Sequence, residues 1–402
     1  MKDFPGMSPS DRTTNRDLLV GPDPGVLASL LAWYDRTRRD LPWRRTTDPY
    51  RIWVSEIMLQ QTTVPTVLRY FDRFIERFPS LEDLSKASLP DVLKLWEGLG
   101  YYQRARNLHR ASAMIPTGAE GPLWPRTVSE WMSLPGIGRS TAGAIYSIST
   151  DSWAPILDAN VRRVTERYFA IPADIRGREA LLWEGSNLWG VDNKRPGDTN
   201  QALMELGAVL CLPSVPDCSH CPVSAFCRTG ERGSGDRMPT EGAIGKKRPA
   251  EKPKKPVRDR VVLVPASGPL LFEPRNEGRL LEGLLDISGF SSSGLAPGTL
   301  ISEGPFRGFR VVGPLFSVRQ TYSHFQERVQ VILIAPPEKV RNPFISGEAR
   351  GEGEGARWAS LEESSALSLT GVARKIVNKF MERKVPMEVI KDPSPGFNFY
   401  SD

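Results

Sequence analysis

The stretch LPGIGRSTAGAI, Leu134 to Ile145, interrupts a helical pattern at Gly136 and Gly138 and starts a new helix at once. Two glycines around an apolar residue allow a tight turn, and the free backbone amides of the next helix can bind a phosphate. An ordinary turn between two helices is the alternative for so short a motif. Because ILDANVRRV and then a cysteine-rich loop follow in that order, the sequence predicts a helix-hairpin-helix.

The rest of the chain divides by its hydrophobic period. Apolar residues three and four apart predict helices from about residue 25 to the cysteine loop, with no comparable strand pattern before residue 258. A stretch rich in Gly, Pro, Lys and Arg follows, and its basic cluster either contacts DNA phosphates or only keeps a tether solvated. Beyond it the period changes to two, with a final helix. The predicted organisation is multidomain: a disordered tail 1–24, an all-α domain 25–227, a linker 228–258, an α+β domain 259–390 and a tail 391–402.

Composition excludes few classes of protein. The 402 residues, 40% hydrophobic and 25% charged, are ordinary for a soluble globular protein of two or three domains. The net charge of +6 makes a polyanion a plausible partner, but it says nothing about the fold. No apolar run approaches a membrane span, and the N-terminal MKDFPGMSPSDRTTNRD lacks the apolar core of a signal peptide. We therefore expect a cytoplasmic protein without a membrane partner.

All the cysteines of the chain lie in one short loop, 211–227. They are too few for a disulfide scaffold in a chain of this length, so a bound metal or cluster is the better interpretation. The spacing favours a four-iron four-sulfur cluster over zinc, because structural zinc sites more often show two separated C-x-x-C pairs. We expect His220, beside the close pair, to face solvent or a phosphate. The predicted ligands are Cys211, Cys218, Cys221 and Cys227.

Five segments together resemble a known family. LPWRRTTDPYRIWVSEIMLQQT, LWEGLGYYQRARNLH, LPGIGRSTAGAI, ILDANVRRV and the cysteine spacing resemble the helix-hairpin-helix DNA glycosylases with an iron–sulfur loop, and among them the MutY-type adenine glycosylases. The resemblance covers roughly residues 25–390. Endonuclease III-like relatives carry a Schiff-base lysine where this chain has Ser140, so the resemblance implies a monofunctional glycosylase. Glu56, in SEIMLQQT, also separates the chain from those relatives.

The resemblance implies a pair of carboxyl groups with opposite tasks. Cleaving the N-glycosidic bond of adenine requires a proton on the purine and stabilisation of a sugar that becomes oxocarbenium-like. By resemblance, Glu56 protonates adenine N7, Asp158 stabilises or transiently bonds to the sugar, and Asn160 holds Asp158 or the catalytic water. We expect apolar neighbours to raise the pKa of Glu56, and the helix N-terminus to keep Asp158 ionised.

A base within a duplex must leave the stack before these carboxyl groups can reach it. By resemblance, Gln61 enters the stack near the vacated position and Tyr101 wedges beside the opposing base. Arg44 either lines the adenine pocket or contacts a phosphate. The DNA-binding residues implied for the helical domain are Gln60, Gln61, Tyr101, Arg44, Leu134, Gly136, Gly138 and Ser140.

The C-terminal segment resembles the Nudix-like domain with which these enzymes read 8-oxoguanine. It has no acidic Nudix box, so we expect no hydrolysis of nucleotides. By resemblance, Tyr322, Ser323 and His324 read the lesion. The segment diverges from the family pattern, because Tyr322 replaces the commoner phenylalanine, and Leu285 and Asp286 replace a tryptophan and a glutamate.

Three functions remain open. The first is an adenine glycosylase, monomeric and nucleoid-associated, acting on double-stranded DNA with A:8-oxoguanine or A:G mispairs. The second is an endonuclease III-like or T/G mismatch glycosylase or lyase. The third is a non-enzymatic DNA-binding module with a zinc knuckle. Glu56 together with Ser140 favours the first over the second.

Overall fold

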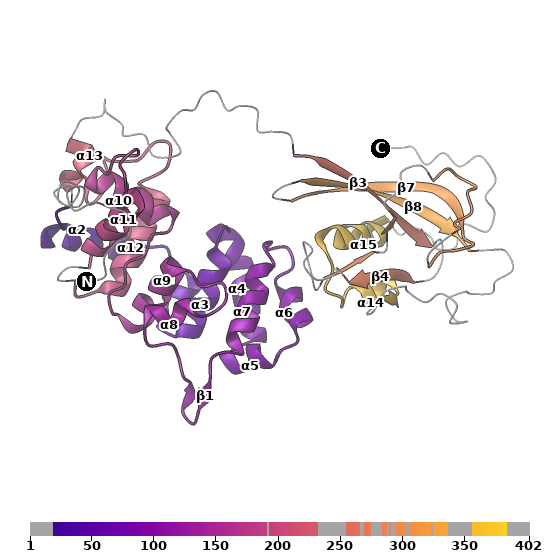
Figure 1. Ribbon diagram of the computed structural model, residues 1–402, viewed down its shortest axis with the longest axis horizontal. Helices are drawn as coiled ribbons and strands as arrows, with labels where there is room; N and C mark the ends of the chain where they lie inside the picture. Colours follow the sequence, from indigo (N-terminus) through magenta and orange to yellow (C-terminus); the bar gives the residue numbers. More distant parts are fainter. Residues whose placement is uncertain are drawn as a thin grey trace. The chain divides into compact units, whose positions relative to one another are not determined.

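The computed structural model divides the chain into two compact units, Met1–Lys86 with Gln103–Pro249, and Ala87–Tyr102 with Ala250–Asp402 (Figure 1). Among the described residues, no helix has the length and apolar character needed to cross a membrane. The structure describes residues 19–190, 193–231, 255–265, 269–274, 284–287, 289–290, 295–302, 305–322, 325–336 and 356–383.

The first unit is helical, as predicted. Several of its helices begin with proline in the first turn, where the missing N–H costs nothing, and Asp23 and Asp48 cap two of them through backbone amides. A short hairpin of two-residue strands departs from the all-α prediction. The elements are α2 (Pro24–Thr37), η1 (Pro42–Arg44), α3 (Pro49–Leu59), α4 (Val64–Arg77), α5 (Leu81–Lys86), α7 (Gln103–Ser112), β1 (Thr117–Gly118), β2 (Gly121–Pro122), α8 (Val128–Met132), α9 (Arg139–Thr150), α10 (Ala159–Phe169), α11 (Arg178–Leu188), α12 (Pro196–Val209), η2 (Ser224–Phe226) and α13 (Arg228–Glu231).

One apolar core joins the hairpin helix to the cysteine loop. It is built from buried residues of α2, α9, α10, α11 and α12, and the rings of Tyr168 and Trp189 lie 4.6 Å apart within it. Cys211, Cys221 and Cys227 pack against the same core from its margin. The loop is therefore attached directly to the helices that follow the hairpin.

The helical pattern of the sequence runs without interruption from residue 51 to 78, whereas the structure has two helices there, α3 and α4, with a break between them. The buried guanidinium of Arg104 donates hydrogen bonds to the carbonyl oxygens of Ile57, Met58 and Gln60, at 2.9, 2.7 and 2.5 Å. It thus satisfies the last carbonyls of α3, which a continuing helix would have bonded itself. The break therefore separates α3, the helix that carries Glu56, from α4.

The second unit contains the predicted α+β fold. One sheet has the order β6-β3-β8-β7, with β3 and β8 parallel, and the other has the order β5-β4-β9. Regular structure enters both ends of the range predicted as a linker, because α13 begins at residue 228 and β3 at residue 257. The elements are α6 (Leu89–Leu95), β3 (Val257–Pro265), β4 (Leu270–Pro274), β5 (Leu285–Ile287), β6 (Gly289–Phe290), β7 (Arg310–Thr321), β8 (Gln326–Ala335), β9 (Arg357–Ala359), α14 (Leu361–Ser364) and α15 (Gly371–Arg383).

Segment 87–102 was predicted within the all-α domain, but it groups with the second unit. The guanidinium of Arg374 binds both carboxylate oxygens of Glu97, at 2.7 and 3.0 Å. The hydroxyl of Ser368 donates to the carbonyl oxygen of Pro90 at 2.7 Å. These contacts connect α6 and the residues after it to the C-terminal fold.

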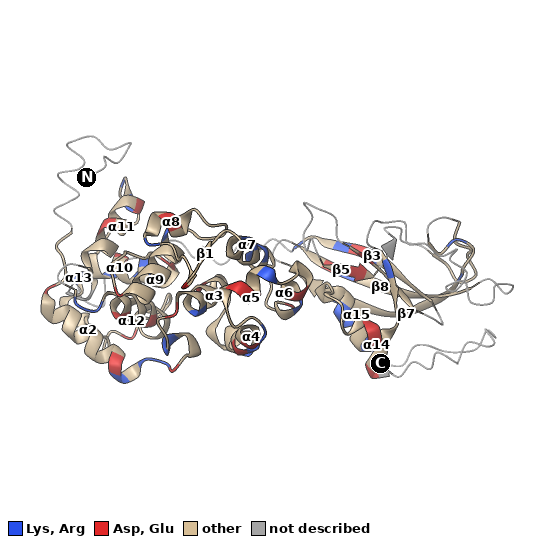
Figure 2. Cartoon of the chain, turned by 90° about the horizontal axis from the view of Figure 1, so that it is seen from below, with Lys and Arg blue, Asp and Glu red and all other residues tan. Residues whose placement is uncertain are grey.

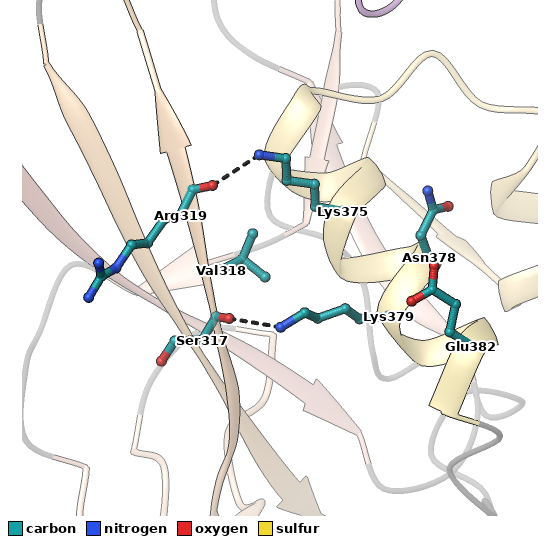
Figure 3. A pocket seen from close by; sticks show the side chains of 7 residues that line it. All are labelled: Ser317, Val318, Arg319, Lys375, Asn378, Lys379 and Glu382. Atoms are coloured by element: carbon teal, nitrogen blue, oxygen red, sulfur yellow. Dashed lines mark hydrogen bonds between the residues drawn. The ribbon is translucent and has the colours of Figure 1, made fainter. Parts of the chain in front are cut away.

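Strand β7 lies at the edge of its sheet, and lysines of α15 donate hydrogen bonds to its carbonyl oxygens (Figure 3). Lys375 donates to the carbonyl oxygen of Arg319 at 3.0 Å, and Lys379 to that of Ser317 at 3.3 Å, beside a cavity of about 340 Å³. Lysines on an edge prevent pairing with another chain. We assign them this protective role, and the cavity contains none of the predicted site residues.

Candidate active site

The predicted hairpin connects α8 to α9. Its two glycines differ in backbone conformation and in the space around them. Gly136 has φ +81°, a left-handed conformation, and a Cβ there would lie 2.8 Å from the side chain of Asn107. Gly138 has φ −86°, which any residue adopts, and a Cβ there would meet nothing within 4 Å. Gln60 attaches α3 to this hairpin, because its amide donates to the carbonyl of Gly136 at 3.4 Å and to the hydroxyl of Thr141 at 3.3 Å.

The hairpin also holds the chain next to the predicted catalytic aspartate. The backbone amide of Leu157 donates to the hydroxyl of Ser140 at 2.9 Å, and Asp158 then caps α10 by accepting from the amide of Val161 at 2.7 Å. Ser140 is thus a positioning residue for Asp158. The side chain of Leu134, predicted to contact DNA, is 7% exposed and belongs to the core.

A series of hydrogen bonds runs from the aspartate to the cysteine loop. The amide of Asn160 donates to Asp158 Oδ2 at 3.4 Å, and Arg163 donates to Asn160 Oδ1 at 2.9 Å. Arg163 also donates to the carbonyl oxygen of Cys211 at 2.6 Å. Helix α12 approaches closely because of Gly207, where a Cβ would lie 2.6 Å from Asn160 Cβ. The predicted association of Asn160 with Asp158 is present, whereas Arg163 was not predicted.

Glu56 and Asp158 are both partly buried and influence each other. Burial, with a smaller contribution from Asp158, raises the pKa of Glu56 to about 7, while Arg44 opposes the rise. Burial also raises the pKa of Asp158 above its usual range, although hydrogen bonds from Val161 and Asn160 lower it in part. The expectation for Glu56 agrees in direction. For Asp158 we expected the helix N-terminus to dominate, and burial outweighs it.

Arg44 belongs to a buried ion-pair network that the sequence did not suggest. Glu205 of α12, with its side chain 1% exposed, accepts from Arg44 at 2.8 Å and from Arg39 at 2.7 and 2.8 Å. Burial raises the pKa of Glu205, but these arginine hydrogen bonds outweigh it and lower the pKa overall. Because Arg44 binds the buried Glu205 and its charge lowers the pKa of Glu56, its position favours the pocket interpretation over a phosphate contact.

The two predicted wedge residues have strained backbones. Gln61, with φ +56°, and Tyr101, with φ +51°, are left-handed although neither is a glycine. The other such residues described, Asp151 and Ala170, are ordinary C-caps of helices. Tyr101 is 49% exposed, and Gln61 is exposed as well. Strain at exposed positions is typical of functional sites, which supports both predictions.

The four cysteines form no disulfide with one another, and Cys218 is exposed while the other three are partly buried. Burial, with contributions from the other three thiols, raises the pKa of Cys221 to about 12. Arg167 donates to Cys211 Sγ at 3.2 Å, and His220 is exposed and pairs with Asp217, as its predicted solvent position implies. Over the described residues, no three His, Cys, Asp or Glu side chains are grouped as for a metal ion.

Of the three residues predicted to read the lesion, the structure describes only Tyr322. Tyr322 directly follows β7 and is partly buried, while Ser323 and His324 lie outside the described residues. Lys and Arg are intermixed with Asp and Glu on both units, so net charge alone does not single out a DNA-binding face (Figure 2).

The raised pKa of Glu56 predicts a stability cost above neutral pH. The folded protein binds the Glu56 proton more tightly than the unfolded chain does, so stability falls as pH rises from the ordinary value of 4.5 to about 7. We expect Glu56→Gln to raise the free energy of unfolding at pH 8 by on the order of 3 kcal/mol, from 1.36 kcal/mol per pKa unit. Urea denaturation at pH 5 and pH 8 measures this, and the gain should largely vanish at pH 5. Exposed Glu76→Gln is the control.

Part of the chain is similar to known DNA repair proteins. Residues 54–187 match the model of the "HhH-GPD superfamily base excision DNA repair protein". An adenine DNA glycosylase of Homo sapiens is 44% identical over 230 residues, 54% of this chain and 41% of that protein. One of Arabidopsis thaliana is 43% identical over 234 residues, 50% of this chain and 36% of that protein. One of Buchnera aphidicola (strain Bp) is 41% identical over 206 residues, 50% of this chain and 57% of that protein.

Residues 54–187 are thus similar to the helix-hairpin-helix superfamily of base excision DNA repair proteins. Within that superfamily the chain is similar to adenine DNA glycosylases, which confirms the resemblance to the MutY type. The chain spans about half the length of the curated relatives that it matches.

Proposed function

We propose that the protein is a monofunctional adenine DNA glycosylase that removes adenine opposite 8-oxoguanine or guanine in duplex DNA. The observation that carries the proposal is Glu56, with a pKa of about 7, interacting with Asp158 next to a helix-hairpin-helix. A carboxyl group half-protonated near neutral pH beside a second carboxyl group suits acid-assisted cleavage of a glycosidic bond.

In this proposal Glu56, protonated, gives its proton to adenine N7. The bond between C1′ and N9 then breaks, and its electron pair leaves with the neutral base. Asp158, ionised, stabilises the positive charge that develops on the sugar, and Asn160 fixes the carboxylate through its 3.4 Å hydrogen bond. Water adds to C1′ and gives a proton to the Glu56 carboxylate, which restores the acid and leaves an abasic site. Gln61 and Tyr101 fill the duplex after the base has flipped.

A lyase is less well supported than a hydrolase. A Schiff-base mechanism needs an amine at the hairpin. Position 140 carries a serine whose hydroxyl accepts from the amide of Leu157. Ser140 thus has a positioning role and no nucleophilic nitrogen.

We further propose that Cys211, Cys218, Cys221 and Cys227 hold a four-iron four-sulfur cluster. Cys211, Cys221 and Cys227 pack against one core, and Arg167 donates a hydrogen bond to Cys211 Sγ at 3.2 Å, which fits one group shared within the loop. The spacing favours this cluster over zinc, because structural zinc sites more often show two separated C-x-x-C pairs. When bound, the cluster would crosslink the loop and keep it folded.

The second unit, by the same proposal, is a Nudix-like reader of the base opposite adenine. Its mixed sheets with a covering helix and the position of Tyr322 between β7 and β8 support this role. We also propose that the enzyme acts as a monomer in the cytoplasm, at the nucleoid.

One assay tests the proposed activity. Single-turnover reactions on duplexes with A:8-oxoguanine, A:G, A:C, T:G and thymine glycol should yield an alkali-labile abasic site only from adenine opposite a purine. Strand cleavage without alkali, or excision confined to T:G or thymine glycol, would contradict the proposal and favour a lyase or an endonuclease III-like enzyme.

A further inference from the structure

A buried cluster of charges connects the two sheets of the second unit. Arg260 of β3 binds Asp286 of β5 at 3.0 and 3.2 Å, and its Nε lies 3.1 Å from Glu327 Oε1 of β8. The residues Asp286 and Glu327 are 4% and 7% exposed. Thr370 donates a further hydrogen bond to Asp286 at 3.0 Å. Buried charges persist only where partners compensate them, so each donor here matters.

The same cluster reaches the connection between β7 and β8. The hydroxyl of Tyr322 donates to Glu327 Oε2 at 3.2 Å, and the amide of Tyr322 donates to the carbonyl of Phe325 at 2.9 Å. The rings of Tyr322 and Phe325 stack with centroids 4.6 Å apart. The guanidinium of Arg258 lies 4.2 Å from the Phe325 centroid, so it must cover the other face of that ring. Both ends of the connection are therefore held in place.

We propose that Asp286, Arg260 and Glu327 anchor the β7–β8 connection, and that the Tyr322 hydroxyl is the link through which this anchor determines the preference for the opposing base. The proposal rests on the reading role given above to residues 322–324. A reader whose ends are fixed before binding loses less conformational entropy on DNA than one that must be ordered there.

Charge balance explains why a tyrosine occupies position 322. The carboxylates of Asp286 and Glu327 both contact the guanidinium of Arg260, and the Tyr322 phenol gives Glu327 Oε2 a neutral donor. Phenylalanine would preserve the stack on Phe325 but leave that carboxylate oxygen without this bond. Tyr322 and Asp286, two of the departures from the family pattern, thus belong to one cluster.

The test compares Tyr322→Phe and Glu327→Gln with the control Arg328→Gln in the full-length enzyme. Arg328 pairs with Asp259 on the same two strands, but its side chain is exposed and alternates to the other face. Hydrogen exchange of the peptide 319–327 should be at least tenfold faster in the two anchor variants and unchanged in the control. The preference for A:8-oxoguanine over A:G should fall at least fivefold in the same two variants. It is measured from single-turnover rates with enzyme in excess over DNA but below saturation.

The two measurements separate failure of the anchor from failure of the reading role. Unchanged exchange in both folded anchor variants would overturn the anchor. Faster exchange with an unchanged preference would overturn the link to base choice. The double variant Ser323→Ala with His324→Ala tests the reading role itself. If this double variant loses the preference for A:8-oxoguanine while Tyr322→Phe keeps it, the reading role is supported and the anchor inference is wrong.

Discussion

Replacing Glu56 by glutamine is expected to reduce single-turnover excision of adenine at least ~100-fold, with affinity for the duplex largely kept. The amide occupies the same space in α3 but has no acidic proton to give to N7. Asp158→Asn should lose as much, because it removes the negative charge that stabilises the developing cation. Rates at saturating enzyme measure the chemical step, and binding to a duplex with an uncleavable adenosine analogue measures affinity.

The pH dependence distinguishes an acid from a merely structural glutamate. If Glu56 acts in its protonated form, excision by wild type falls as pH rises through about 7, whereas the residual activity of Glu56→Gln lacks that limb. Because the same variant should be more stable at pH 8, its inactivity could not be attributed to unfolding. Excision within tenfold of wild type in both carboxyl variants would contradict the proposed chemistry.

The sequence predicted local features of this site better than distant ones. Gly136 was predictable because a left-handed turn favours glycine, and Asp158 because an aspartate before an amphipathic run is a helix cap. Each signal lies within a few residues. The break after α3 was missed because it depends on Arg104, whose guanidinium comes from more than forty residues further along the chain.

Electrostatics at the site depends on tertiary contacts that no local pattern encodes. Arg44 was chosen by resemblance, but its partner Glu205 lies 161 residues away and reads as an ordinary glutamate of an amphipathic helix. Burial raises the pKa of Asp158, which its position at a helix N-terminus did not suggest, and burial is a property of the packed helices. The helical fold of the first unit and the capping position of Asp158 were therefore predictable, whereas the tertiary partners around the candidate site were not.

Replacing Cys218 by serine is expected to abolish the iron–sulfur cluster and to lower affinity for DNA at least tenfold. Cys218 is the informative position because it is the exposed member of the four, while the others are partly buried. A serine there removes one sulfur ligand without opening a cavity in the core. Loss of absorbance near about 400 nm, and of iron by elemental analysis, reports the cluster. Zinc in wild type at one atom per chain would contradict the assignment.

The Cys218→Ser substitution should also slow the excision step, because the cysteine loop is hydrogen-bonded to residues outside it. Arg163 joins the carbonyl of Cys211 to Asn160, which in turn holds Asp158, so a loop without its crosslink weakens the support of the catalytic carboxylate. We therefore expect excision at saturating Cys218→Ser enzyme to fall as well, by less than in Asp158→Asn. His220→Ala, an exposed change in the same loop, should leave cluster, affinity and excision near wild type. A Cys218→Ser protein without iron that still binds and cuts like wild type would show that the thiols hold nothing the enzyme needs.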